Sequence, residues 1–186
     1  MHEIAEEAGM NKALLHYYFR SKDRLYEAVF KHVLEIFQAS LQFPMEPEVS
    51  YPEALQVFID NLFDLHAGHP EISRLWMHEN LNGAPVVARL MKQHLDSDFN
   101  AGPNQFLRRT KQAIEDGEIV PQDPLQVLVS VLGATIFFFL AAPTLAFVFP
   151  GHFRDQDEAV RVRKKHVFEL LYNGLAKSEN LKPGAS

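Results

Sequence analysis

The chain has 186 residues, 47% of them hydrophobic, so it is long enough to bury a substantial core. It contains no cysteine, which excludes disulfide bonds and thiolate metal sites. The formal net charge is -6, whereas a protein that coats nucleic acid over its whole surface is basic, so any DNA-binding surface must be local. The N-terminus is polar and acidic, so we predict no secretory signal peptide and expect a cytoplasmic protein.

The first residues predict two short helices joined by a turn. Apolar residues recur at helical spacing before Gly9, which suits the left-handed position that ends a helix. Asn11 is a good N-cap for the second helix, and Ser21 is a good N-cap for a third. This order is typical of a helix-turn-helix, in which the second helix enters the major groove of DNA.

The second predicted helix has two different faces. Leu15, Tyr18 and Phe19 fall at i, i+3 and i+4, which places them on one side. The opposite side carries side chains that can bind phosphates and base edges, or that are small enough for close approach: Lys12, Ala13, His16 and Tyr17.

The segments IAEEAGMNK from Ile4 and YYFRSKDRL from Tyr17 closely resemble the TetR family of bacterial transcriptional regulators. The resemblance covers residues 2 to about 30, and Leu14 and His16 depart from its commonest residues, Thr and Tyr. It implies a phosphate contact from Lys22 and DNA contacts from Asn11, Lys12, Ala13, Leu14, His16 and Tyr17. It also implies a small core made of Ile4, Ala8, Leu15, Tyr18, Phe19 and Leu25.

TetR-like proteins carry a basic arm and a complete amphipathic helix before this motif, whereas Met1 stands where the second helix of the family begins. We therefore expect a truncated or mis-started chain in which Ile4, Leu15 and Phe19 lose part of a packing partner. Operator binding is then expected if the first helix is supplied, and weak or absent DNA binding is expected without it. The alternative function is a helical ligand-binding and dimerisation module that has lost DNA binding.

The remaining sequence predicts amphipathic helices and no strand pattern of convincing length, so the expected fold class is all-α. The helices are expected at 22–42, 53–67, 71–81, 85–99, 104–116, 125–149 and 157–176. The first of these crosses into a second domain and is a natural lever for coupling the two. We expect a partial helix-turn-helix domain with its connecting helix at 1–42, followed by a ligand-binding and dimerisation domain at 43–180.

Residues 125–149 are uncharged and long enough to span a bilayer. Pro143 is expected to interrupt the helix, and a helix that is apolar all round also suits a buried bundle or a dimer interface. We therefore predict no membrane association and a homodimer through helices 125–142 and 157–175, which matches operators of two-fold symmetry. The basic run 161–166 is interpreted as a solvated helix face.

The resemblance implies a pocket for a small apolar or aromatic effector in the second domain. The candidate lining residues are Phe63, Trp76, Glu79, His94, Phe137 and Phe138. Glu79 and His94 are the candidate polar anchors, although a surface glutamate and a satisfied histidine are the ordinary alternatives. Ordinary core packing is the alternative for the phenylalanines.

Scattered histidines suggest a metal site only weakly. His66, His69, His78 and His94 show neither an H-E-x-x-H motif nor a pair at i, i+4, so no metal and no other cofactor is predicted. No catalytic constellation or phosphate-binding glycine loop is present, so the protein is not expected to be an enzyme. The sequence thus predicts a ligand-responsive DNA-binding transcriptional regulator that acts as a homodimer and represses transcription.

Overall fold

The structure, a computed structural model, describes residues 1–46, 48–98 and 100–176. Within them the chain is helical, and an isolated bridge joins Ile119 to Ala176. The helices are α1 (His2–Glu7), α2 (Lys12–Phe19), α3 (Lys22–Ser40), α4 (Tyr51–Gly68), α5 (Pro70–Leu81), α6 (Pro85–Ser97), α7 (Gly102–Glu115), α8 (Pro124–Val148), the 3₁₀ turn η1 (Pro150–His152) and α9 (Gln156–Leu175). The predicted all-α fold class is confirmed.

The local signals at the start of the chain act as predicted. Gly9 has a φ of 61°, in the left-handed region. The Asn11 side chain accepts a hydrogen bond from the Ala13 amide at 2.8 Å and so caps α2. The Ser21 hydroxyl accepts one from the Arg24 amide at 3.2 Å and caps α3. These short-range bonds fix the turn before α2 and the turn after it.

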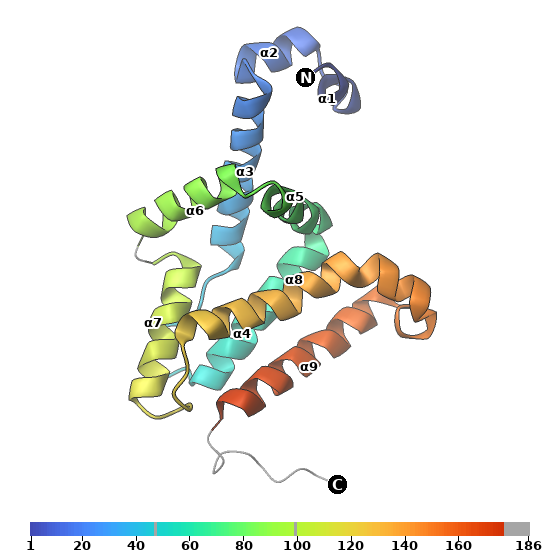
Figure 1. The fold of residues 1–186 in the computed structure, drawn as a ribbon. Helices are drawn as coiled ribbons and strands as arrows, with labels where there is room; N and C mark the ends of the chain where they lie inside the picture. Colours follow the sequence, from blue (N-terminus) through green and yellow to red (C-terminus); the bar gives the residue numbers. More distant parts are fainter. Residues whose placement is uncertain (47, 99, 177–186) are drawn as a thin grey trace.

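Helix α3 joins α1 and α2, at one end of the molecule, to the larger helical body (Figure 1). Its buried residues Phe30 and Val33 pack into that body, and α3 contacts α4 and α6 there. Helix α4 lies at the centre of the body, where it packs against α8 and α9. Aromatic side chains pack between α4 and α7, where the ring centroids of Phe58 and Phe106 lie 4.9 Å apart.

Helix α8 continues through Pro143, so the prediction that this residue interrupts the helix is wrong. A proline removes one backbone donor from the ladder, and the turns on either side keep the remaining bonds. The helix is long and apolar enough to cross a membrane by length and composition, with 22% of its most apolar window buried within the chain. Core helices of globular proteins meet the same criteria of length and composition, but they are mostly buried.

The basic run on α9 is only partly a solvated face. Arg161 is exposed and paired with Glu158, as expected for such a face. Arg163 instead donates to the Ala134 carbonyl oxygen on α8 at 3.2 Å. Lys164 pairs with Asp64 on α4 at 2.6 Å. The charges of this run therefore also hold α9 against its two neighbours.

Candidate functional site

Helix α2 presents a polar face to solvent at the tip of the molecule. Leu15 is buried, whereas its neighbours Leu14 and His16 are exposed, and Tyr17 is 76% exposed. The other predicted DNA-contacting residues are exposed as well: Asn11, Lys12, Ala13 and Lys22. All seven therefore lie where a ligand as large as a DNA duplex can reach them.

The small core beneath α2 contains fewer residues than predicted. Ala5 and Leu15 are buried, and Phe19 and Leu25 are half-buried. Tyr18 is 65% exposed, and its ring meets Tyr17 edge-on with the centroids 5.4 Å apart. Ile4 and Ala8 are exposed too, so the placement of these three residues in the core is wrong. Two helices of six and eight residues and the first turns of α3 cover too little area to bury them.

The six predicted effector residues lie in different surroundings, and Phe137 faces solvent. Phe63 and Phe138 pack together, with ring centroids 6.0 Å apart, in the α4–α8 interface. Trp76 packs against Phe37 of α3 at 5.7 Å. His94 is half-buried on α6, and Phe137 is 67% exposed on the outer face of α8. Because α8 is apolar on every side, its sequence does not reveal which phenylalanine points inward.

Glu79 is buried, which contradicts the surface alternative, and both of its carboxylate oxygens are occupied. Oε2 accepts from the Tyr26 hydroxyl at 2.6 Å, and Oε1 accepts from the amides of Val86 and Val87 at 2.6 and 3.1 Å. Burial acts to raise the pKa of Glu79, but these donors outweigh it and hold the pKa below its usual value. Burial and Glu79 together raise the pKa of Tyr26 to about 12. Glu79 thus caps α6 and ties it to α3 and α5.

His66 is a buried polar group that the sequence suggested only as a weak metal ligand. It is 1% exposed, and its Nδ1 lies 2.8 Å from the hydroxyl oxygen of Ser73 on α5. The imidazole contacts the rings of Phe37 and Phe139, whose centroids lie 6.1 and 5.6 Å from its own. Its Nε2 has no hydrogen-bond partner. The Thr135 hydroxyl on α8 is equally buried and without a partner.

The titration of His66 links stability to pH. Burial lowers the pKa of His66 from 6.5 to about 4. At a pH between these two pKa values the histidine is protonated in the unfolded chain but neutral in the folded one. The contribution of His66 to stability is therefore greatest above pH 6.5 and decreases as the pH falls towards 4. We expect the free energy of unfolding, measured with urea, to fall about 2 kcal/mol more between pH 7 and pH 4.5 than it does for His66→Phe. Equal losses in both proteins would contradict this assignment.

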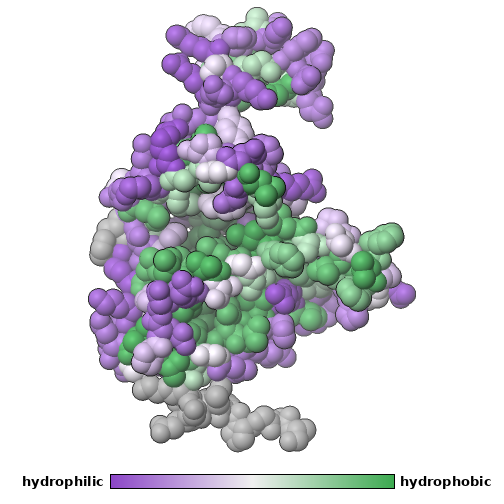
Figure 2. Space-filling view, viewed as in Figure 1, coloured by the Kyte–Doolittle hydropathy of each residue, from purple (hydrophilic) through white to green (hydrophobic). Residues whose placement is uncertain are grey.

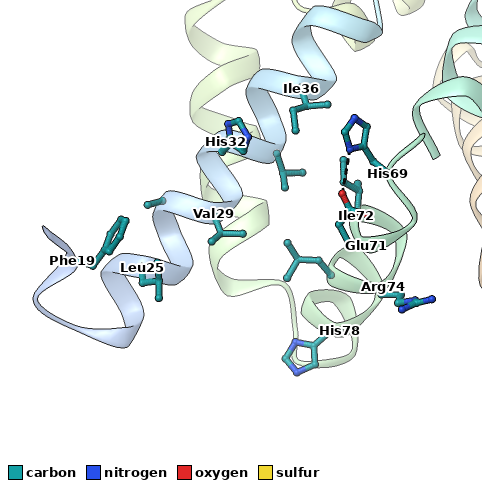
Figure 3. Close-up of a pocket in the computed structure, with 13 residues that line it drawn as sticks. Phe19, Leu25, Val29, His32, Ile36, His69, Glu71, Ile72, Arg74 and His78 are labelled. Carbon is teal, nitrogen blue, oxygen red and sulfur yellow. Dashed lines mark hydrogen bonds and ion pairs between the residues drawn. The ribbon is translucent and has the colours of Figure 1, made fainter. Parts of the chain in front are cut away.

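A groove of about 780 Å³ runs between α3 and α5 (Figure 3). Leu25, Val29 and Ile36 of α3 form one wall, and Ile72 and Leu75 of α5 belong to the other. The lining contains none of the six predicted effector residues, and His32, His69, Arg74 and His78 supply most of its polar groups. The groove lies beside α3, the helix that joins α1 and α2 to the larger body.

An apolar surface covers the outer side of α8 and the segment that follows it (Figure 2). Val129 and Phe137 on α8 are more than half exposed, and Phe147 and Phe149 continue this surface. Leu170 of α9 is 60% exposed. A surface of this kind on a helix pair is typical of a protein–protein interface.

Among the described residues, no group of three His, Asp or Glu side chains is placed to hold a metal ion.

Two family models match the chain. The model described as "Bacterial regulatory proteins, tetR family" matches residues 1–29. The model described as "Tetracyclin repressor-like, C-terminal domain" matches residues 52–170.

Curated relatives agree with these matches. The HTH-type transcriptional regulator RutR of Escherichia coli K12 is 30% identical over 156 residues, which cover 84% of this chain and 71% of the relative. RutR of Shigella flexneri matches to the same extent. The HTH-type transcriptional repressor SCO4008 of Streptomyces coelicolor is 32% identical over 78 residues, 42% of this chain and 37% of that protein. The chain therefore belongs to the TetR family of bacterial transcriptional regulators.

Proposed function

We propose that this protein is a cytoplasmic, ligand-responsive repressor that binds double-stranded operator DNA as a homodimer. The exposed face of α2 carries this proposal: Leu15 anchors the helix from within, while Lys12, His16 and Tyr17 face outward. The similarity to SCO4008, a transcriptional repressor, supports a repressing role. The family match to residues 1–29 gives no support to the alternative module without DNA binding.

In this proposal the DNA-contacting residues are Asn11, Lys12, Ala13, Leu14, His16, Tyr17 and Lys22. The DNA-binding unit with its connecting helix comprises residues 1–42. The effector and dimerisation domain comprises residues 43–180, of which 177–180 lie outside the described residues. A dimer through α8 and α9 would present two copies of α2 to successive major grooves, which are about 34 Å apart.

Helix α5 offers a path from the effector domain to the DNA-binding unit. Its Trp76 packs against Phe37 of α3. Its Glu79 accepts a hydrogen bond from Tyr26, which lies nearer to α2 on the same helix α3. A ligand that moves α5 would therefore move α3 at two points. A coupling of about 3 kcal/mol, or roughly a hundredfold change in operator affinity, is enough for a useful switch.

Selection of bound duplexes from a random DNA library by the full chain tests the proposal. We expect enrichment of a two-fold symmetric sequence whose half-sites are separated by about one helical turn. Absence of any enriched sequence would overturn the DNA-binding part. The proposed ligand response alone would be overturned if no fraction of a cellular metabolite extract changed the affinity of the protein for an enriched operator.

Lys22 is predicted to contact a phosphate, so its removal should change the salt dependence of binding. For Lys22→Ala we expect about tenfold weaker operator binding and a slope of log K against log salt that is smaller by about 0.9. Fluorescence anisotropy between about 50 and 200 mM salt measures both quantities. Lys92→Ala is the matched control, because Lys92 is exposed on α6 and pairs there with Asp96. An unchanged slope for Lys22→Ala would exclude the contact.

A further inference from the structure

The turn between α2 and α3 contains an arginine in a rare backbone conformation. Helix α2 ends at Phe19 and α3 begins at Lys22, so only Arg20 and Ser21 connect them (Figure 1). Arg20 has a φ of 56° and a ψ of -35°. Its amide donates to the His16 carbonyl oxygen at 2.9 Å, and the Ser21 amide donates to the Phe19 carbonyl oxygen at 2.5 Å. A hydrogen bond that spans two residues around a positive φ defines a γ-turn of the strained type.

This conformation is unfavourable for an arginine. At positive φ the Cβ atom crowds the backbone, and glycine adopts the same region without that cost. The turn on the other side of α2 uses a glycine, because its residue at positive φ is Gly9, with a φ of 61°. Strained residues of this kind cluster at sites that bind ligands or act as switches. The backbone alone therefore favours glycine at position 20, and the arginine side chain needs another explanation.

The polar contacts of the Arg20 side chain do not supply this explanation. The side chain is exposed, and within the described parts of the chain its guanidinium has neither an ion-pair nor a hydrogen-bond partner. Cations elsewhere on the surface are paired, as Lys31 is with Glu27 and Lys92 is with Asp96. The guanidinium of Arg20 is therefore available to an anion outside the chain.

The charges around Arg20 favour such an anion. Residues 12–24 contain four cations and a single acid: Lys12, Arg20, Lys22, Arg24 and Asp23. Helix α1 carries three glutamates, and the whole chain has a net charge of -6. A local excess of positive charge on an acidic protein attracts anions to that part of the surface. Because this excess adjoins the exposed face of α2, a DNA phosphate is the anion that fits.

Arg20 and Lys22 are spaced to reach two different phosphates. The Cα atoms of residues two apart are separated by at most about 7.6 Å. Successive phosphates of one DNA strand follow each other every 3.4 Å or so along the helix axis, so about two phosphates fall within this span. Arginine suits such a contact because its planar guanidinium can donate two parallel hydrogen bonds to one phosphate.

We infer that Arg20 is a DNA-contacting residue that binds the phosphate next to the one bound by Lys22, and that this contact offsets the strain of its turn. The inference rests on the proposed operator binding and adds a residue to those that the sequence predicted. A phosphate contact reads no base, so Arg20 supplies affinity and fixes the orientation of α2 without selecting a sequence.

The variant Arg20→Gly tests the inference, because it removes the guanidinium and relaxes the turn at the same time. We expect the melting temperature of the full chain to equal or exceed that of the wild type. Fluorescence anisotropy with an enriched operator should show about tenfold weaker binding and a slope of log K against log salt that is smaller in magnitude by about 0.9. The affinity for an unrelated duplex should fall by the same factor.

Two further variants and one control complete the experiment. Arg20→Lys keeps the charge and should keep the wild-type slope. Arg20→Gly combined with Lys22→Ala should reduce the slope by about 1.8, because two phosphates lose their contacts. Arg154→Gly is the matched control, since Arg154 is also exposed and lies between η1 and α9, and it should change neither affinity nor slope.

The outcomes distinguish this inference from the proposed function. A wild-type chain that binds no duplex would overturn the proposed function and the role of Arg20 with it. If the wild type binds, an unchanged slope in Arg20→Gly would overturn the role of Arg20 alone. So would a lower melting temperature of Arg20→Gly, or a double variant whose slope equals that of Lys22→Ala.

Discussion

Gly102→Ala is expected to destabilise the protein by at least about 3 kcal/mol. Gly102 begins α7 and is buried against the backbone at the end of α3, where an added Cβ would overlap the carbonyl oxygen of Leu41. A backbone atom cannot rotate away as a side chain can, so α7 and the end of α3 must separate. Urea unfolding followed by circular dichroism measures the loss.

Gly174→Ala is the matched control for this prediction. Gly174 is also a helical glycine, in the last turn of α9, but a Cβ there would meet nothing within 4 Å. Alanine is a better helix former than glycine, so we expect this variant to be more stable by up to about 1 kcal/mol. If Gly102→Ala unfolds at the same urea concentration as the wild type, the close packing of α7 on α3 is not a feature of the protein.

Phe137→Glu is expected to separate the proposed dimer into folded monomers. Phe137 is 67% exposed in the middle of α8, and Val129 lies two turns before it on the same face. In a symmetric interface the substitution places two carboxylates in an apolar contact, which should weaken the dimer at least a thousandfold. Sedimentation velocity gives the mass of the species, and circular dichroism checks that the helices remain.

Leu81→Glu provides the control for the dimer experiment. Leu81 is 78% exposed at the end of α5, outside the surface of α8 and α9. It should remain a dimer and retain operator affinity, whereas Phe137→Glu should lose at least a hundredfold in that affinity, because one monomer engages only one half-site. A Phe137→Glu protein that still sediments as a dimer would place the interface elsewhere.

Sequence patterns determined the local structure of this chain. Gly9, Asn11 and Ser21 predicted the turns and caps around α2 because the relevant bonds span only two or three residues. The helix-turn-helix spacing identified the family, and the family matches confirm it. Apart from the predicted interruption of α8 at Pro143, helix ends fell within a few residues of those predicted, since prolines and glycines mark most of them.

Tertiary packing alone decided which side chains lie together. Helix α8 is apolar all round, so periodicity gave no contrast between Phe137, which faces solvent, and Phe138, which packs on Phe63. The positions of Glu79 and His66 depend on partners 53 and seven residues away along the chain, Tyr26 and Ser73. Hydrogen bonds between helices follow from how the helices cross, and that geometry is set by the whole core rather than by any single segment.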